Sequence, residues 1–187
     1  KWLPDLEDTN KFSLDVLKRL IRKNTKLIVI NFPHNPTGAL LNHAELKELI
    51  EIAKSKGIRI FSDEMYRYSE QNQTDQLPAA CEIFSKGISL SGLSKSFSLP
   101  GLRVGWLVSS DPVIINKIKY FKDYTTIRGA APSEILAIIA LRAKDTILAR
   151  NQSIISRNLK ILSDFFEEYK STFSWHRPIA GTTCFPK

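Results

Sequence analysis

Two short apolar runs on either side of a capped helix constrain the fold of this sequence most strongly. The first run covers residues 26–31, and a cluster of turn residues follows it. Asn42 then begins a helix with Glu45 in the capping-box position, and Gly57 ends that helix. The second run covers residues 58–63. A strand, a helix and a strand within about 35 residues form a βαβ crossover, so the two strands should be parallel.

The later part of the chain continues the alternation of strands and helices. Strands are expected near residues 87–90 and over 103–108. Helices are expected to begin at Pro112 and Pro132, and a long helix is expected over about 150–170. The pattern predicts an α/β fold with a mainly parallel sheet flanked by helices, in three layers (α/β/α).

Two of these segments are apolar on more than one face. The continuous run 26–31 is typical of a strand that is buried on both faces. Residues 135–141, in the helix that begins at Pro132, are apolar nearly all round and should be buried. A length of 187 residues is enough for one substantial hydrophobic core.

Composition and charge argue against several classes of protein. The sequence has no run of about 18 apolar residues and no visible signal peptide, so no membrane span is expected. The net charge of +8 comes from Lys and Arg scattered among acidic residues, so nucleic-acid binding is not expected. Cys81 and Cys184 form no CxxC pair, and the histidines show no metal-ligand spacing. We therefore expect no metal site and a reduced, cytoplasmic setting.

Lys95 is the first candidate for chemistry. It follows the apolar strand residues Ile88 and Leu90, so it should lie just beyond a short buried strand. Desolvation lowers the pKa of an ammonium group, and the free amine can then form an imine with a carbonyl. Arg103 lies eight residues later and offers a planar fork of donors suited to a phosphate.

Three stretches, taken in order, resemble the class I/II aminotransferases, which are pyridoxal-phosphate (PLP) enzymes of fold type I. The lysine stretch contains Gly92-Leu93-Ser94-Lys95 and, further on, Arg103-Val104-Gly105. The other two stretches are Asn31-Phe32-Pro33-His34-Asn35-Pro36-Thr37-Gly38 and Ser62-Asp63-Glu64-Met65-Tyr66. The order and spacing are similar to those of the family, and the resemblance runs through nearly the whole chain.

The resemblance implies pyridoxal 5'-phosphate as the cofactor and gives each motif a role. Lys95 would hold PLP as a Schiff base, the internal aldimine, and its freed amine would then move a proton between the substrate α-carbon and the cofactor. Asp63 would contact the pyridine nitrogen and keep it protonated, which makes the ring a better electron sink. Tyr66 and Asn35 would hydrogen-bond the phenolic oxygen, and Asn35-Pro36 resembles a peptide bond that is often cis in the family.

The resemblance also implies that Ser94 and Arg103 bind the cofactor phosphate. Many relatives carry Ser or Thr where this chain has Gly92, and Ser91 is a candidate to compensate. Residues of these types have structural roles as well, because Asp63 fits a turn cap and Arg103 fits a surface ion pair. For Tyr66, the structural alternative is a half-buried core residue.

The expected strands bring the candidate residues to one edge of the sheet. Asn35, Asp63 and Lys95 each lie just past the carboxyl end of an expected strand. Ligands of open α/β sheets gather outside the carboxyl ends of parallel strands. We therefore expect an amide, a carboxylate and an amine to converge there.

The first functional hypothesis is an aminotransferase that moves an amino group between an amino acid and a 2-oxo acid. The alternatives are another fold-type-I PLP enzyme (a β-lyase, a decarboxylase or an amino-acid-cyclising synthase) and the aminotransferase-like sensor domain of a transcription regulator. The runs 124–127 and 132–134 look similar to a subgroup with cyclising members. Substrate identity does not follow from the sequence.

The resemblance implies that the chain is a central part of a larger enzyme. Residues 1–170 would belong to the PLP-binding large domain, and 171–187 would start a truncated small domain. Relatives are homodimers, and they carry an upstream phosphate loop, a ring-stacking aromatic and a downstream carboxylate-binding arginine that this sequence lacks. We expect the segment alone to be inactive and to expose apolar surface where those parts would pack.

Overall fold

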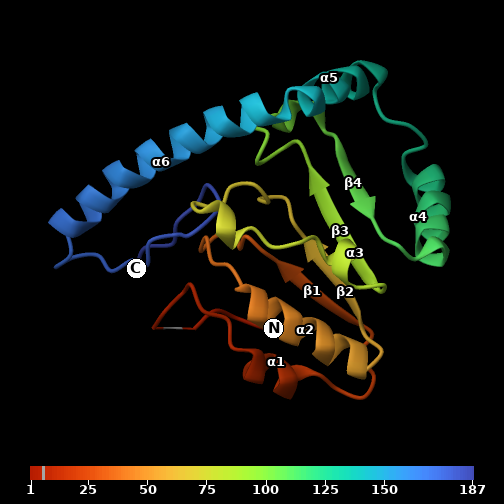
Figure 1. The fold of residues 1–187 in the computed structure, drawn as a ribbon, viewed down its shortest axis with the longest axis horizontal. Helices are drawn as coiled ribbons and strands as arrows, with labels where there is room; N and C mark the ends of the chain where they lie inside the picture. The colour runs from red at the N-terminus through yellow and green to blue at the C-terminus, as the bar shows by residue number, and fades with distance from the viewer. Residues whose placement is uncertain (6) are drawn as a thin grey trace.

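The computed structural model describes residues 1–5 and 7–187, and over these residues the chain forms a four-stranded sheet with flanking helices (Figure 1). The strands are β1 (Leu27–Asn31), β2 (Arg59–Asp63), β3 (Gly87–Gly92) and β4 (Gly105–Val108), and they lie side by side in that order. β1, β2 and β3 are parallel, whereas β4 pairs antiparallel with β3. The predicted βαβ crossover and the mainly parallel α/β sheet are confirmed.

The helices pack beside the sheet and beyond its β4 edge (Figure 1). They are α1 (Leu14–Leu20), α2 (His43–Ser55), α3 (Ala80–Ile83), α4 (Pro112–Thr125), α5 (Ala131–Arg142) and α6 (Lys144–Glu168). Two short 3-10 turns are η1 (Gln73–Asp75) and η2 (Pro100–Leu102). The long helix begins six residues before the predicted position 150, and it extends away from the sheet toward the C-terminal segment (Figure 1).

Helix α2 begins with the predicted capping box. The Asn42 side chain accepts a hydrogen bond from the Glu45 backbone N–H (2.9 Å), and the Glu45 carboxylate accepts one from the Asn42 N–H (2.7 Å). These two bonds satisfy backbone donors that the first helical turn leaves free. The helix is therefore fixed at its start, and its apolar stripe faces the sheet. The buried residues of the stripe are Leu46, Leu49, Ile50 and Ala53.

The main hydrophobic core lies between one face of the sheet and helices α1 and α2. Ile28 and Ile30 of β1 and Ile60 of β2 are buried there. The prediction that the strand at 26–31 is buried on both faces is wrong for this chain, because Val29 is 64% exposed and Leu27 is also exposed. Successive side chains of a strand point to opposite faces, and no described element covers the second face of β1.

Helix α5 was predicted to be buried nearly all round, and this prediction is also wrong. Ala137 and Ala140 are its buried residues, and they mark the narrow face that packs toward η2 and α6. The large apolar side chains of the helix lie in solvent: Ile135, Leu136, Ile138, Ile139 and Leu141. Aromatic residues of α4 are exposed as well, namely Tyr120, Phe121 and Tyr124. Apolar surface of this extent is typical of a face that packs against another part of a protein.

The strand predicted over 103–108 begins at Gly105 in the structure. Arg103 has a left-handed backbone (φ +53°), which is incompatible with the extended conformation of a strand. The turn formed by η2 and Arg103 reverses the chain, so β4 returns alongside β3 in the antiparallel direction.

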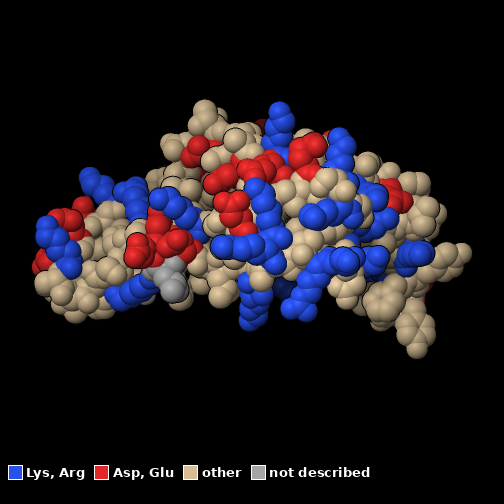
Figure 2. All heavy atoms as spheres, turned by 90° about the horizontal axis from the view of Figure 1, so that it is seen from below, with Lys and Arg blue, Asp and Glu red and all other residues tan. Residues whose placement is uncertain are grey.

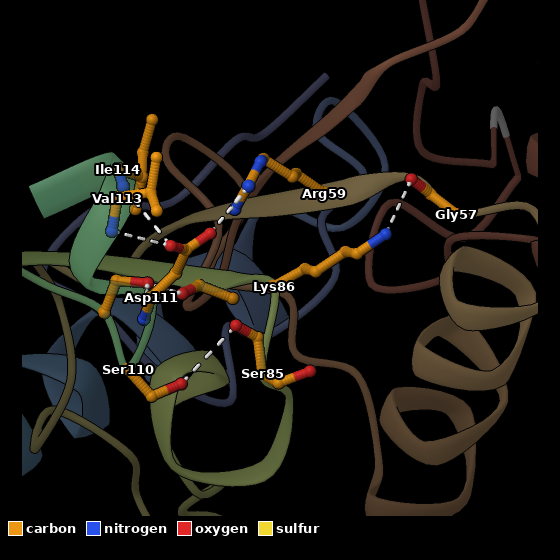
Figure 3. Close-up of polar contacts among 10 residues, drawn as sticks. Gly57, Arg59, Ser85, Lys86, Ser110, Asp111, Val113 and Ile114 are labelled. Carbon is orange, nitrogen blue, oxygen red and sulfur yellow. Dashed lines mark hydrogen bonds and ion pairs between the residues drawn. The ribbon is translucent and has the colours of Figure 1, made fainter. Parts of the chain in front are cut away.

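An ion pair connects the start of β2 to the start of α4 (Figure 3). Nη2 of Arg59 lies 2.7 Å from Oδ2 of Asp111, and both side chains are partly buried. The other carboxylate oxygen of Asp111 accepts from the backbone N–H groups of Val113 and Ile114, so Asp111 also caps α4. The Asp111 carboxylate thus accepts hydrogen bonds from the free backbone N–H groups at the start of α4 and anchors this helix to the sheet.

We expect the stabilisation from Asp111 to be lost in acid. The hydrogen bond from Arg59 lowers the pKa of Asp111 below its ordinary value, and the two backbone donors lower it further. A lowered folded-state pKa stabilises the fold above the unfolded-state pKa of about 3.9, and this contribution disappears as the pH falls through the folded-state pKa. Asp111→Asn keeps a good helix cap but removes the charge.

The measurement compares urea unfolding midpoints of the wild-type chain and Asp111→Asn between pH 7 and pH 3. The wild-type advantage should be present at pH 7 and should shrink toward pH 3. An advantage that does not change with pH would show that the charge of Asp111 contributes nothing.

Leu49 is the best single probe of the main core. Its side chain is 0% exposed and packs in the cluster between α2 and the sheet. Leu49→Ala should lower the free energy of unfolding by about 2–5 kcal/mol, because it removes buried apolar atoms and leaves a cavity. Leu3→Ala is the matched control, since Leu3 is 62% exposed, and its effect should stay within about 0.5 kcal/mol. Chemical unfolding of both variants tests the prediction, and equal effects would contradict it.

Basic and acidic side chains are interspersed on the face of the molecule seen in Figure 2. Surface ion pairs contribute to this mixture, for example Lys18 with Asp15 (3.0 Å) and with Glu48 (2.7 Å). Across residues 1–5 and 7–187, no helix is both long and apolar enough to cross a membrane.

Candidate active site

The loop after β1 is built around Asn31 and carries Asn35 to the carboxyl edge of the sheet. Oδ1 of Asn31 accepts the backbone N–H of Asn35 (2.9 Å), and Nδ2 of Asn31 donates to the carbonyl oxygen of Asp63 at the end of β2 (3.2 Å). The side chain of Asn31 therefore connects the loop to the neighbouring strand. The Asn35-Pro36 bond is cis, as the resemblance implied.

His34 has a structural place in the same loop. Its Nδ1 lies 2.8 Å from Oγ1 of Thr37, and its ring packs edge-on against Phe12. Burial lowers the pKa of His34 below its ordinary value. In the described part of the chain, no group of three or more His, Cys, Asp or Glu side chains is placed to hold a metal ion.

The two adjacent acids at the carboxyl end of β2 differ in burial. Asp63 is half-buried, and its Oδ1 accepts the backbone N–H of Met65 (3.2 Å). Glu64 is buried and points elsewhere, where its Oε1 accepts from the Ala80 N–H (3.0 Å) and from Oγ of Ser89 (2.8 Å). Glu64 thus has a structural role, and Asp63 is the carboxylate left available at the sheet edge.

Asn35, Tyr66 and Lys95 come together although they are far apart in the sequence. Nδ2 of Asn35 donates to Oη of Tyr66 (3.3 Å), and Nζ of Lys95 lies 5.7 Å from the centre of the Tyr66 ring. Tyr66 is buried, whereas Asn35 and Lys95 are exposed and can reach a ligand. The amide, the phenol and the amine predicted from the sequence are therefore neighbours.

The turns around Asp63 and Lys95 are also in contact. Oγ of Ser96 donates to the carbonyl oxygen of Met65 (3.2 Å), so the residue after Lys95 is bonded to a residue between Asp63 and Tyr66. Asp63 and Lys95 thus belong to two joined turns at one edge of the sheet.

Ser94 follows β3, and Arg103 lies just before β4. Gly92 pairs with Gly105, and the Leu93 N–H donates to the Val104 carbonyl oxygen, but the left-handed backbone of Arg103 (φ +53°) ends the extended pairing there. Arg103 is exposed, and its Nη1 donates to the carbonyl oxygen of Pro100 (2.9 Å). The roles of Ser94 and Arg103 as phosphate ligands stay predictions.

A cavity of about 290 Å³ adjoins Lys95 and extends between α6 and the C-terminal segment. Sequence reasoning did not predict its lining. Residues from four separate segments line it, among them Tyr68, Lys95, Arg150, Asn151, Gln152, Thr182 and Cys184. One feature of the sequence could have indicated this lining. Asn151 precedes Ile155 and Leu159 at steps of four, on the apolar face of the long helix. A polar residue on such a face needs a buried hydrogen-bond partner.

Comparison with known proteins decides the family. The family model described as "Aminotransferase class I and II" matches residues 4–185. The chain belongs to the class I and II aminotransferase family. The fold supports this assignment, because the crystal structure of a PLP-dependent aminotransferase from Streptococcus suis matches 100% of this chain with a TM-score of 0.91 and 37% identity. This chain covers 48% of that structure.

Curated relatives carry two kinds of name. A protein named probable N-succinyldiaminopimelate aminotransferase, from Mycobacterium tuberculosis, is 29% identical over 88% of this chain and 43% of its own length. Capreomycidine synthase of Streptomyces vinaceus is 26% identical over 100% of this chain and 45% of its own length. The chain therefore spans a little under half the length of these two relatives.

Proposed function

We propose that the protein containing this chain is a PLP-dependent aminotransferase, which transfers an amino group between an amino acid and a 2-oxo acid. The observation that carries the proposal is the meeting of Lys95, Tyr66 and Asn35 at the carboxyl edge of the sheet, next to Asp63. Membership of the class I and II family and the similarity to a PLP-dependent aminotransferase support the same cofactor.

The side chains at this edge match the groups of pyridoxal phosphate. We assign the Lys95 amine to covalent attachment and the Asp63 carboxylate to the pyridine nitrogen. Asn35 and Tyr66 already share a hydrogen bond, so one phenolate oxygen of the cofactor would find both donors together. Ser94 and Arg103 supply a hydroxyl and a guanidinium for the phosphate, a pairing that gives charge-assisted hydrogen bonds.

Asp63 and Lys95 have different roles in the proposed reaction. Bound pyridoxal phosphate supplies an electron-withdrawing ring that accepts the electrons left behind when the substrate α-proton departs. Asp63 would keep the ring nitrogen protonated and so strengthen that electron withdrawal. The amine of Lys95 would accept the substrate α-proton and later donate a proton back, so Lys95 would act as the general base and acid.

Reduction of the cofactor-loaded protein with borohydride tests the proposal. The absorbance of the Schiff base should disappear, and peptide mapping should find the pyridoxyl group on Lys95. A label on a different lysine would refute the site. In a separate sample that has not been reduced, incubation with a panel of amino acids should convert the cofactor absorbance to that of pyridoxamine phosphate.

A second candidate is another fold-type-I PLP enzyme, such as an amino-acid-cyclising synthase. The match to capreomycidine synthase over the whole of this chain favours it. Both candidates use the same cofactor residues, and they differ in the substrate bond that is broken. A bound cofactor that never converts to pyridoxamine phosphate with any amino acid would favour this second function.

We also propose the domain organisation and the setting of the protein. Residues 1–170 would form part of the PLP-binding large domain, and 171–187 would begin the small domain. The C-terminal segment is bonded to the loop after β1, because the N–H groups of Ile179 and Ala180 donate to the Gly38 carbonyl oxygen (3.1 and 3.0 Å). We place the protein in the cytoplasm as a homodimer, and its two cysteines, Cys81 and Cys184, are free thiols as that setting favours.

A further inference from the structure

We infer that Asn151, on helix α6, is a positioning residue that holds the turn carrying Lys95. Nδ2 of Asn151 donates to the carbonyl oxygen of Ser96, the residue after Lys95, over 2.9 Å. The two residues are 55 positions apart in the sequence, so the bond is a tertiary contact. The inference rests on the proposed function for the role of Lys95.

The environment of Asn151 makes this bond a specific one. Asn151 is 8% exposed, and a buried amide is costly unless its polar atoms are bonded. Its Nδ2 is used by Ser96, and its Oδ1 accepts from Nη1 of Arg150 (3.1 Å). The Asn151 amide thus has a donor and an acceptor function that substitutions can separate.

The Lys95 turn is held from several directions, and Asn151 supplies the polar contact from α6. Leu93 and Phe97 are buried in a small cluster that includes Ala137 of α5. Ser96 contacts Met65 through its hydroxyl and Asn151 through its carbonyl. With the apolar residues anchored on either side, the Ser96 carbonyl bond fixes the peptide next to Lys95, and hence the place from which the Lys95 side chain extends.

The neighbouring residue Gln152 holds the second active-site turn in the same way. Its Nε2 donates to the carbonyl oxygen of Glu70 (3.0 Å), four residues after Tyr66. Two successive side chains of α6 therefore bond to the turn that carries Lys95 and to the segment just after the turn that carries Tyr66. This arrangement gives α6 a role in the geometry of the site as well as in packing.

Three variants separate the functions of Asn151. Asn151→Ala removes the donor and the acceptor together. Asn151→Asp keeps the size and the acceptor for Arg150, but it places a carboxylate against the Ser96 carbonyl. Arg150→Ala removes the other contact and leaves the bond to Ser96 intact. Ser156→Ala, on an exposed position of α6, is the control for a change in the helix itself.

Hydrogen–deuterium exchange of the full protein without cofactor is the primary readout. The amides of Ser98 and Leu99 close the turn by bonding to Lys95 and Leu93. They should exchange about tenfold faster in Asn151→Ala and Asn151→Asp, because a buried hydrogen bond is lost. They should exchange as in the wild type in Arg150→Ala and Ser156→Ala, and the amides of β1 and β2 should be unchanged throughout.

Labelling with pyridoxal phosphate and borohydride is the second readout. The share of label on Lys95 should fall in Asn151→Asp relative to the wild type. Wild-type exchange rates in Asn151→Asp would overturn the inference. So would equal acceleration in β1 and β2, or loss of the helical circular-dichroism signal, because Asn151 would then support the whole fold. If the wild-type protein were labelled on a lysine other than Lys95, the proposed function would be wrong. The exchange rates would still show whether Asn151 holds the turn.

Discussion

Replacing Lys95 with alanine is expected to abolish covalent attachment of pyridoxal phosphate and to lower kcat by about 10²–10⁴-fold. The amine has two proposed tasks, attachment of the cofactor and transfer of the α-proton, and alanine can perform neither. The neighbouring groups remain in place, because Tyr66 is buried and keeps its bond to Asn35. The loss should therefore fall on kcat and on cofactor attachment while the fold is retained.

The measurement combines steady-state kinetics, the absorbance spectrum and peptide mapping after reduction. Lys86→Ala is the matched control, because Lys86 is an exposed lysine just before the opposite end of β3 and its Nζ donates to the Gly57 carbonyl oxygen (3.4 Å) (Figure 3). It should keep wild-type activity and spectrum. Retention of activity by Lys95→Ala would remove the basis of the proposed function.

Replacing Asp63 with asparagine is expected to lower kcat by about 10²–10³-fold, the effect of losing one well-placed electrostatic contact in an active site. Asparagine has the same shape, and its Oδ1 can still accept from the Met65 N–H as Asp63 does. It carries no negative charge, so the ring nitrogen loses the partner that keeps it protonated. Covalent attachment to Lys95 should survive, which distinguishes this variant from Lys95→Ala.

Kinetics and borohydride labelling of the same preparation test the effect of Asp63. Glu64→Gln provides a contrast from the adjacent acid. Glu64 is buried with bonds to Ala80 and Ser89, so its replacement should lower the unfolding midpoint rather than kcat. If Asp63→Asn turned over at the wild-type rate, the assignment of Asp63 to the pyridine nitrogen would be wrong.

Local signals in the sequence predicted the parts of this fold that depend on neighbouring residues. The Asn42–Glu45 capping box forms as predicted, because its side-chain bonds lie within one helical turn. The strand ends that deliver Asn35, Asp63 and Lys95 were also predictable, since the turn residues that end a strand follow it directly.

Burial and long-range contacts could not be predicted in the same way. An apolar pattern shows that a face can be buried, but it does not show whether another part of this chain packs against that face. Val29 and the large apolar side chains of α5 are exposed for this reason. Arg103 lies in a turn where an extended strand was expected, because its left-handed backbone is set by the reversal into β4. The contact between Asn151 and Ser96 joins residues that no local pattern relates.

The solvent-facing apolar side chains of α5 have a practical consequence for work with this chain. Five large aliphatic side chains of one helix, between Ile135 and Leu141, form an apolar stripe that is exposed to solvent. Such a stripe favours adsorption to plastic, co-purification with chaperones and precipitation at high concentration. Handling the polypeptide therefore calls for mild detergent or low protein concentration, even though its inner core is well formed.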